Sequence, residues 1–120
     1  MGTNIHIYVK NDQTPVWEYL SSTDIRWGAG KSELRDKMLI SQFWDGDGFN
    51  FDPSKHDLQE VVTHLKNVEK VIEEWMEANG THVDWSFRYD DWLYVKLWSR
   101  MFQDLLTLHQ LHVQCKIAGF

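Results

Sequence analysis

Two short stretches hold residue types that can bind an ion or a phosphate group. His109, His112 and Cys115 are spaced by three residues, and zinc accepts imidazole and thiolate ligands. On a straight helix, however, the first and third of them are about 9 Å apart along the axis, too far for one ion. Residues 28–32 (Gly-Ala-Gly-Lys-Ser) match the end of a phosphate-binding loop, but the complete motif needs a glycine where Ile25 stands. We therefore expect no metal ion and no cofactor.

Residues 44–52 are rich in aspartate and glycine and could bind either an ion or a protein. A calcium loop needs oxygen ligands at alternating positions and a glutamate at the twelfth, but Phe49 occupies the fifth position and His56 the twelfth. Aromatic side chains flank the acidic ones, and functional residues are frequent on loops that a rigid scaffold positions. We therefore expect an exposed loop whose partner-binding residues are Trp44, Asp45, Asp47 and Phe49.

A cluster of carboxylates offers a second kind of chemistry. The stretch Glu73-Glu74-Trp75-Met76-Glu77 resembles half of the metal-binding motif of the all-helical nucleoside triphosphate pyrophosphatases. In that family a Glu-x-x-Asp pair on a later helix completes the magnesium site. Residues 101–104 have this spacing, but Met101 stands in place of the glutamate, so a magnesium ion would lose a ligand. The resemblance implies magnesium-dependent nucleotide hydrolysis through Glu73, Glu74 and Glu77, whereas the usual role of such charges is a solvated helix face.

The composition is that of an ordinary globular domain, with 42% hydrophobic and 25% charged residues. One domain, residues 1–120, is the natural count at this length. The formal net charge of −6 opposes binding to the backbone of a nucleic acid and suits a partner with a basic patch. Seven Trp, six Phe and four Tyr can fill a core or supply a binding surface.

Three features of the sequence predict a cytoplasmic protein. Cys115 is the single cysteine, so no disulfide can form within the chain, which is typical of a reducing compartment. Residues 1–10 lack the basic and apolar segments of a signal peptide. No apolar run approaches the length of a membrane span, so we expect no membrane contact.

Hydrophobic periodicity predicts the elements of the first half of the chain. Ile5, Ile7 and Val9 alternate with polar residues, as in a half-buried strand. Turn-forming residues follow, after which the chain can return as the second strand of a hairpin. The expected elements are a strand at 3–10, a strand at 16–20, a loop at 21–30, a short helix at 31–43 and a loop at 44–52.

The second half of the chain is predicted to hold two long helices and two strands. Apolar residues recur every three or four positions over residues 53–79, where Asp52 can cap the helix. The helix at 91–110 is apolar on all but a narrow stripe, although 92–97 could instead extend a hairpin. The two later strands are expected at 81–90 and 113–117. The predicted fold is α+β, a small antiparallel or mixed sheet packed by the two helices.

The first residues carry a second resemblance. Residues 2–9 (Gly-Thr-Asn-Ile-His-Ile-Tyr-Val) resemble the opening of a family of small, uncharacterised phage and prophage proteins, which often begin Gly-Thr-Asp-Ile-His. Asn4 and Lys10 replace the acidic residues usual in that family. The resemblance implies a phage or mobile-element origin and, for a phage protein, a host-cell setting.

These observations favour a non-enzymatic acidic binding protein that inhibits a host protein, such as a defence component. The predicted contacts are those of the 44–52 loop, because aromatic anchors contribute much of the binding energy at protein interfaces. An alternative is an oligomer that captures a nucleotide or signalling molecule on its polar strand faces, around His6, Tyr8 and Arg88. A homodimer through the apolar 91–110 helix is a further expectation, because so thin a polar stripe implies burial on several sides.

Overall fold

The computed structural model describes residues 3–13, 15–20, 23–28, 30–79 and 89–119. Its elements in chain order are β1 (Asn4–Lys10), β2 (Glu18–Tyr19), β3 (Ile25–Arg26), α1 (Ser32–Lys37), the 3-10 helix η1 (Ser41–Phe43), β4 (Trp44–Asp45), β5 (Gly48–Phe51), α2 (Leu58–Asn79), α3 (Tyr89–Gln110) and β6 (Gln114–Gly119). The strands form an open antiparallel sheet in the order β2-β1-β6-β5-β4, and β3 also pairs with β1. The fold is therefore α+β, as predicted.

The last strand of the chain lies in the middle of this sheet. β6 pairs with β1 on one side and β5 on the other, so that Ile117 is opposite both Ile7 and Phe51. All three side chains are fully buried, because alternate residues of a strand point to the same face. The alternation predicted for the first and last strands is therefore confirmed, as is the N-terminal hairpin of β1 and β2. The short strand β3 lies where a loop was expected.

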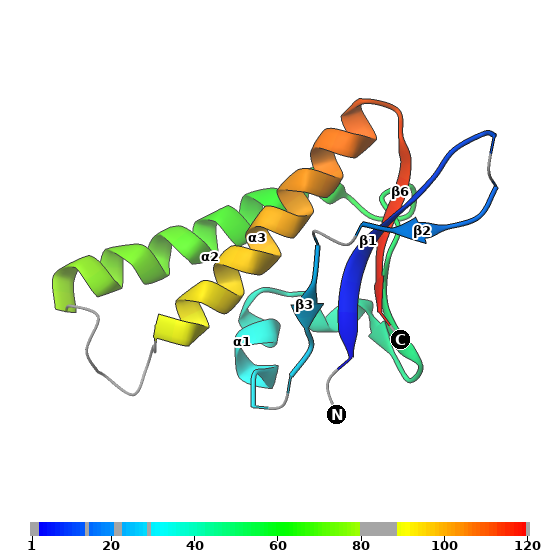
Figure 1. Cartoon of the computed structure of the whole chain (residues 1–120). Coiled ribbons are helices and arrows are strands. Elements are labelled where there is room, and N and C mark those ends of the chain that lie inside the picture. The colour runs from blue at the N-terminus through cyan, green and yellow to red at the C-terminus, as the bar shows by residue number, and fades with distance from the viewer. Residues whose placement is uncertain (1–2, 14, 21–22, 29, 80–88, 120) are drawn as a thin grey trace.

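Helices α2 and α3 run antiparallel to each other, and the C-terminal half of α3 covers the sheet (Figure 1). Trp98, Phe102 and Leu105 of α3 are fully buried and recur at the spacing of one helix face. Residues 92–97 are therefore helical, because they continue the helix that presents these side chains to the sheet. The predicted strand at 81–90 lies mostly outside the described residues, and its last two positions belong to α3.

The N-terminus of α2 differs from the prediction. Asp52 does not cap the helix, because its carboxylate accepts hydrogen bonds from the backbone and hydroxyl of Ser54 in a preceding turn. The helix begins at Leu58, and the Asp57 carboxylate accepts a hydrogen bond from the backbone N–H of Glu60 at 3.1 Å. The expected apolar stripe is confirmed, since Leu58, Val62, Leu65 and Ile72 are buried.

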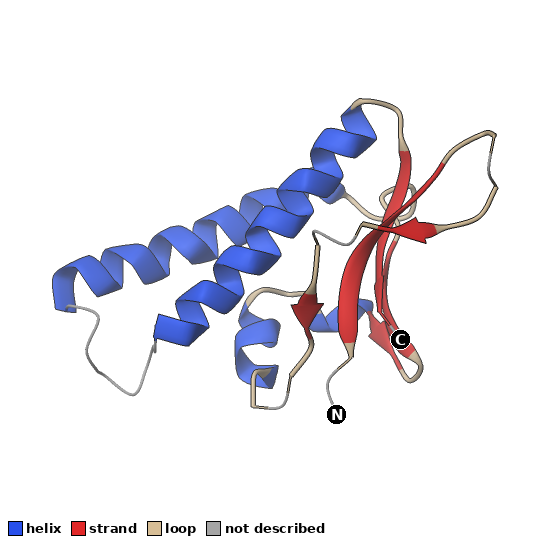
Figure 2. Ribbon diagram, viewed as in Figure 1, coloured by secondary structure: helices blue, strands red, loops and turns tan. Residues whose placement is uncertain are grey.

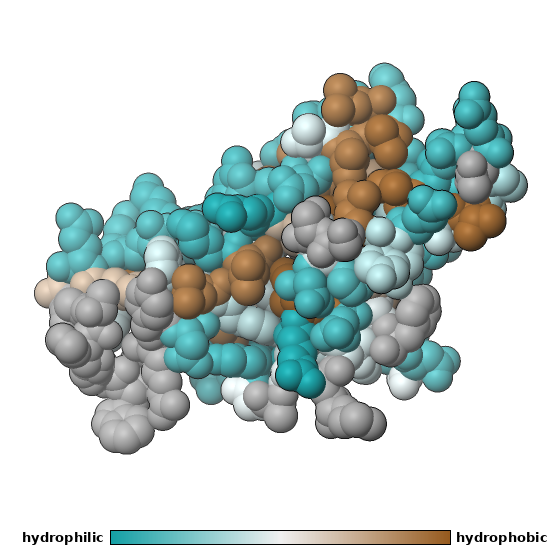
Figure 3. Space-filling view, in the orientation of Figure 1, coloured by the Kyte–Doolittle hydropathy of each residue, from teal (hydrophilic) through white to brown (hydrophobic). Residues whose placement is uncertain are grey.

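The molecule is elongated, with extents of 51 × 31 × 23 Å. The sheet lies at one end, and α2 and α3 extend beyond it toward the other (Figure 2). Apolar side chains also show on the outer surface of α3 (Figure 3), where Leu93 and Leu97 are exposed by 39% and 47%. The predicted homodimer through this helix stays a prediction. Among the described residues, no helix has the length and apolarity that a bilayer crossing requires.

Candidate functional site

A groove of about 780 Å³ lies between the start of α2 and the segment that joins α1 to η1. Both walls come from elements that the hydrophobic core holds in place, since Leu58 and Val62 of α2 and Met38 and Phe43 opposite are buried. The volume is within the usual range for a site that binds a small molecule or a side chain. Its lining residues are Met38, Leu39, Gln42, Phe43, His56, Asp57, Gln59, Glu60, Val61, Thr63, His64 and Asn67.

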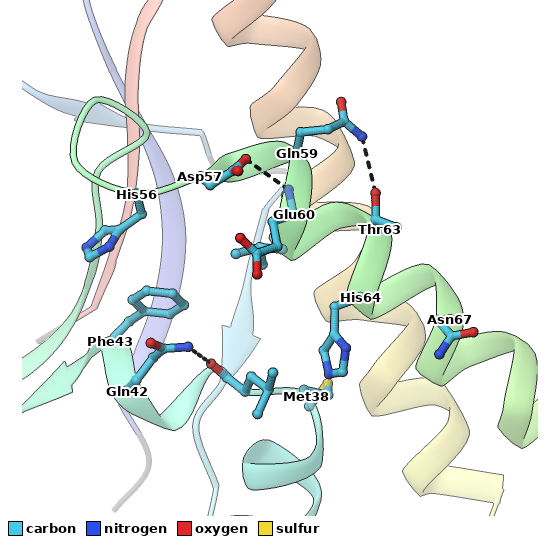
Figure 4. A pocket seen from close by; sticks show the side chains of 12 residues that line it. Met38, Gln42, Phe43, His56, Asp57, Gln59, Glu60, Thr63, His64 and Asn67 are labelled. Carbon is cyan, nitrogen blue, oxygen red and sulfur yellow. Dashed lines mark hydrogen bonds between the residues drawn. The ribbon is translucent and has the colours of Figure 1, made fainter.

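The polar wall of the groove is one face of α2 and the turn before it. Glu60 and His64 are four residues apart on α2, which brings them to one side of the helix, and His56 belongs to the turn before it. In Figure 4, Glu60 and His64 project from α2 toward Met38 and Gln42 on the facing segment. The Nε2 atom of His64 lies 2.9 Å from the carbonyl oxygen of Lys37, so His64 donates this hydrogen bond and closes one end of the groove.

Apart from Gln42, the side chains on the opposite wall are apolar. Met38 and Phe43 are 1% and 8% exposed and form the floor. The ring of His56 packs against that of Phe43 at a centroid distance of 4.9 Å, so the floor continues across to the helix side. Leu39 stands at the edge with 55% of its surface exposed. The groove therefore combines an apolar, aromatic base with a polar rim.

Leu39 adopts a backbone conformation that leucine avoids. Its φ is +61°, in the left-handed region, which costs a residue with a Cβ about 1–2 kcal/mol. Leu39 comes directly after Met38, the C-cap residue of α1, at a position where glycine is the usual residue. The backbone N–H of Ile40 donates to the carbonyl oxygen of Arg35, a bond typical of this helix ending. Leu39 is thus an exposed apolar side chain in a strained position at the edge of the groove.

The charge of the groove is negative. Asp57 and Glu60 contribute two carboxylates, and among the described residues that line the groove none is lysine or arginine. The described residues also contain no group of three or more His, Cys, Asp or Glu side chains that could hold a metal ion. An acidic rim over an apolar base is suited to a cationic group carried on a hydrocarbon stem.

The predicted partner-binding loop is a β-hairpin, and one of the side chains expected to be exposed on it is buried. Phe49 is only 1% exposed, because β5 pairs with the central strand β6 and turns this ring into the core. Trp44 is half-buried and stacks on Trp27 at 4.6 Å. Asp45 and Asp47 are exposed at the turn, where the Asp45 carboxylate accepts hydrogen bonds from the backbone N–H groups of Asp47 and Gly48. Their role in binding a partner stays a prediction.

The alternative ligand-binding residues are brought together in part. His6 and Tyr8 share one face of β1, and the ring of Tyr19 lies 4.7 Å from His6 and 6.1 Å from Tyr8. Arg88 lies outside the described residues. This arrangement does not test the prediction that these residues bind a nucleotide or signalling molecule.

A second hollow, of about 420 Å³, is lined by His109, His112 and Cys115 together with Asp12, Trp17 and Asp52. Cys115 is buried, and burial together with the negative charge of Asp52 raises the pKa of its thiol to about 11. A thiol with a raised pKa is a poor metal ligand and a poor nucleophile, because both roles need the thiolate.

The other chemical candidates are separated or already engaged. Glu73, Glu74 and Glu77 are exposed toward the C-terminal end of α2, whereas Asp104 is near the C-terminal end of the antiparallel α3, so the two halves of the pyrophosphatase motif lie at opposite ends of the pair (Figure 1). In the loop at 28–32, Lys31 pairs with Asp90 at 2.9 Å and Asp91 at 2.7 Å.

The sequence held one signal for the groove that periodicity can reveal. Glu60 and His64 recur at a spacing of four residues outside the buried stripe of α2, and His56 lies four residues earlier, in the turn before the helix. Nothing in the sequence indicated that Leu39 and Gln42 lie across from them, because that contact joins segments far apart in the chain. Comparisons with protein-family models, curated proteins and solved structures found no match to this chain.

Proposed function

We propose that this chain is a non-enzymatic binding protein that binds a basic surface of another protein. The contact is made at the groove between α2 and the α1–η1 segment. The resemblance of residues 2–9 to small phage proteins favours a phage-type factor whose partner is a host protein that it inhibits. The net charge of −6 supports a basic partner, because complementary charge speeds association and selects the partner.

The observation that carries the proposal is the chemistry of the groove. Met38 and Phe43 offer apolar and aromatic surface for the hydrocarbon part of a long side chain. Glu60, on the helix wall above them, offers a carboxylate for its charged end. Arginine and lysine are the protein side chains with an apolar stem and a cationic head, so a basic side chain of the partner is the natural occupant.

The strain at Leu39 supports the same function. A glycine at this position would relieve the left-handed conformation, and yet the chain carries a large apolar side chain that is 55% exposed. Its exposed side chain adds apolar surface to the groove. Strained residues that persist are concentrated at binding and active sites.

The test is a titration with three blocked peptides that are identical except for a central arginine, glutamine or glutamate. We expect the arginine peptide to shift the NMR signals of Leu39, Gln42, Glu60 and His64, while the other two leave them unchanged. The double variant Asp57→Asn, Glu60→Gln should bind about tenfold more weakly, because hydrogen bonds to charged groups contribute about 1.5–3 kcal/mol. Asparagine still caps a helix, so this variant should keep the fold.

The double variant Glu73→Gln, Glu74→Gln provides the matched control, because Glu73 and Glu74 are exposed carboxylates of the same helix that do not line the groove. If this control weakens binding as much as the variant of Asp57 and Glu60, the effect is one of total charge and the groove is not the site. Equal binding of the glutamate peptide would also contradict the proposal.

A second pair of variants separates stability from binding. Leu39→Gly should raise the free energy of unfolding by about 1 kcal/mol. It should also weaken binding of the arginine peptide. His112→Gly relieves the same strain, at φ +62°, but lies outside the groove, so it should leave binding unchanged. Unchanged binding in Leu39→Gly would show that this side chain has no role in recognition.

A further inference from the structure

The exposed side of α3 carries a regular stripe of residues, which we call the outer stripe. Its members are separated by alternating steps of four and three residues, so they lie on the side of the helix opposite the buried Trp98 and Phe102. They are Leu93, Leu97, Arg100, Asp104, Thr107 and Leu111. An average step of 3.5 residues is the repeat by which one helix keeps a seam against another. The stripe is about 27 Å long, at 1.5 Å per residue.

The outer stripe is apolar toward both of its ends. Leu93 and Leu97 are exposed near the start of α3, and Leu111 is 67% exposed at the other end. Leu111 follows the last residue of α3, and its backbone N–H still donates to the carbonyl oxygen of Thr107 at 3.1 Å, so it continues the last helical turn. Figure 3 shows brown surface along this helix. Single exposed leucines are ordinary, but several on one stripe mark a surface that another molecule covers.

The centre of the outer stripe is charged. Arg100 and Asp104 are both exposed, and neither belongs to an ion pair within the part of the chain that the structure describes. They border a shallow hollow between α3 and α2, to which Glu69 and Lys96 also contribute. One positive and one negative side chain therefore stand about one helical turn apart on the stripe.

The other carboxylates and the lysine of α3 are paired within the chain. The ammonium group of Lys96 lies 3.6 Å from the carboxylate of Glu69 on α2. Asp90 and Asp91 share the ammonium group of Lys31, at 2.9 Å and 2.7 Å. The guanidinium and the carboxylate at the centre of the outer stripe therefore remain for a partner.

The outer stripe is complementary to itself when its direction is reversed. Its midpoint is residue 102, so Arg100 and Asp104 are equally far from the midpoint, as are Leu93 and Leu111. A two-fold axis at this midpoint, perpendicular to the helix, places a second copy antiparallel to the first. Arg100 of each copy then meets the partner's Asp104, and Leu93 meets the partner's Leu111. A two-fold interface requires this kind of self-complementarity.

Parallel pairing of the same two stripes is unfavourable. Each residue would then meet its own copy, so that two Arg100 side chains and two Asp104 side chains would stand together. Like charges that face each other across an interface oppose association. In the antiparallel arrangement opposite charges meet, and Leu97 packs against the partner's Thr107.

We propose that the outer stripe is the interface of a homodimer in which α3 of one copy packs antiparallel against α3 of the other. The leucines at both ends are covered in this dimer. Two symmetry-related ion pairs between Arg100 and the partner's Asp104 fix the register, as polar residues do in the seams of coiled coils.

The dimer is a weak one. A single pair of helices of this length makes a small interface, in the class below about 1,200 Å² that is typical of transient contacts. The net charge of −6 on each copy also opposes association. We therefore expect a monomer at low micromolar concentration and a dimer near millimolar concentration.

The groove proposed for partner binding lies outside the outer stripe. Its lining residues come from α2, the turn before it and the α1–η1 segment. Two copies therefore offer two grooves, which a partner with two basic sites can bind at once. The two surfaces are separate, and neither proposal depends on the other.

The test is sedimentation velocity of the full chain from micromolar to millimolar concentration. We expect the mass to rise from that of one chain toward that of two. Arg100→Asp and Asp104→Arg each place like charges opposite each other, so each should weaken the dimer about tenfold or more. An equimolar mixture of the two variants should recover the dimer, because opposite charges then meet again across the interface.

Lys70→Asp is the matched control. It makes the same change of charge as Arg100→Asp, at a side chain that is 71% exposed on α2 and outside the outer stripe. It should leave the dimer as stable as that of the wild type. Thermal unfolding of each variant checks the fold, and recovery of the dimer in the mixture shows independently that both charge variants are folded.

A disulfide cross-link tests the orientation of the two helices. Leu93→Cys and Leu111→Cys are each made in a Cys115→Ala background, so that each chain holds a single thiol. Mild oxidation of an equimolar mixture should join one variant to the other, because antiparallel pairing brings these two positions together and a disulfide forms only between close residues. Oxidation of Leu93→Cys alone should give little cross-linked product.

Four results would overturn the proposal. A chain that stays monomeric at millimolar concentration would show that the outer stripe does not bind a second copy, which leaves a different protein as its partner. An equal loss of dimer in Lys70→Asp and Arg100→Asp would indicate general charge repulsion. A mixture of the two charge variants that stays monomeric would show that these side chains do not meet. Preferential cross-linking of Leu93→Cys to itself would indicate parallel pairing.

Discussion

The guanidinium group of Arg35 stacks on the indole of Trp27, with Cζ 4.1 Å from the ring centre. Its Nη1 donates to the carbonyl oxygens of Trp27 and Gly28 and to the hydroxyl of Tyr94, which in turn donates to Trp27 at 2.8 Å. Arg35 is only 6% exposed. This buried cation ties α1 and the preceding loop to α3, and thereby fixes one wall of the groove.

We expect Arg35→Met to lower the free energy of unfolding by about 2–4 kcal/mol. Methionine fills much of the volume, but the part-buried carbonyl oxygen of Gly28 loses its donor. Arg35→Lys should recover only part of the loss, because an ammonium cannot stack and bridge as a guanidinium does. Urea denaturation measures both, and Arg100→Ala, at an exposed position of α3, serves as the control. A loss below 1 kcal/mol in Arg35→Met would show that the network adds little to stability.

Gly119→Ala should destabilise the sheet by about 1–3 kcal/mol, the usual cost of forcing extra volume into a packed region. A Cβ at this position would lie 2.6 Å from Cγ1 of Ile5 and 2.7 Å from the carbonyl oxygen of Asn4, so β1 and β6 would have to separate. Gly46→Ala is the control, since a Cβ there meets nothing within 4 Å. Thermal unfolding should show a lower Tm for the first variant alone, and similar Tm values for both would contradict this packing.

His112→Gly should stabilise the fold by about 0.5–1 kcal/mol. His112 has φ +62° just after the end of α3, where glycine pays no steric penalty. The backbone N–H of Val113 donates to the carbonyl oxygen of Leu108, so the helix ending does not require the His112 side chain. Chemical denaturation of the variant checks the sign. A destabilised variant would mean that the imidazole makes a contact that stabilises the fold by more than the left-handed backbone conformation costs.

Cys115 should make stability fall at alkaline pH. Its thiol has a pKa of about 11 in the fold, against a reference value of 9.0. Between these values the unfolded chain has lost a proton that the folded chain retains, so the free energy of unfolding decreases as pH rises through this window. We expect wild type to lose roughly 1–2 kcal/mol more than Cys115→Ala between pH 8 and pH 10.5. Urea denaturation at the two pH values tests this, and equal losses in both proteins would show that the thiol does not contribute.

The sequence by itself determined the elements with a strong period. The alternation of Ile5 and Ile7 identified β1, and the spacing of Leu58, Val62 and Leu65 identified α2. These patterns are local, because burying one face of a strand or helix constrains only residues near in sequence. The start of α2 was predicted five residues too early, because Asp52 and Asp57 are both good caps. Asp52 caps a turn at Ser54 instead, and Asp57 caps the helix.

Only the tertiary structure decided where distant segments meet. Pairing of β5 with β6 buried Phe49, which the loop composition had placed on the surface. Insertion of β6 beside β1 put Lys116 next to Tyr8. Packing of α2 against the α1–η1 segment placed Glu60 and Leu39 in the lining of one groove. Each of these contacts depends on which strands and helices pair across long sequence separations, and a local hydrophobic pattern is compatible with many such pairings.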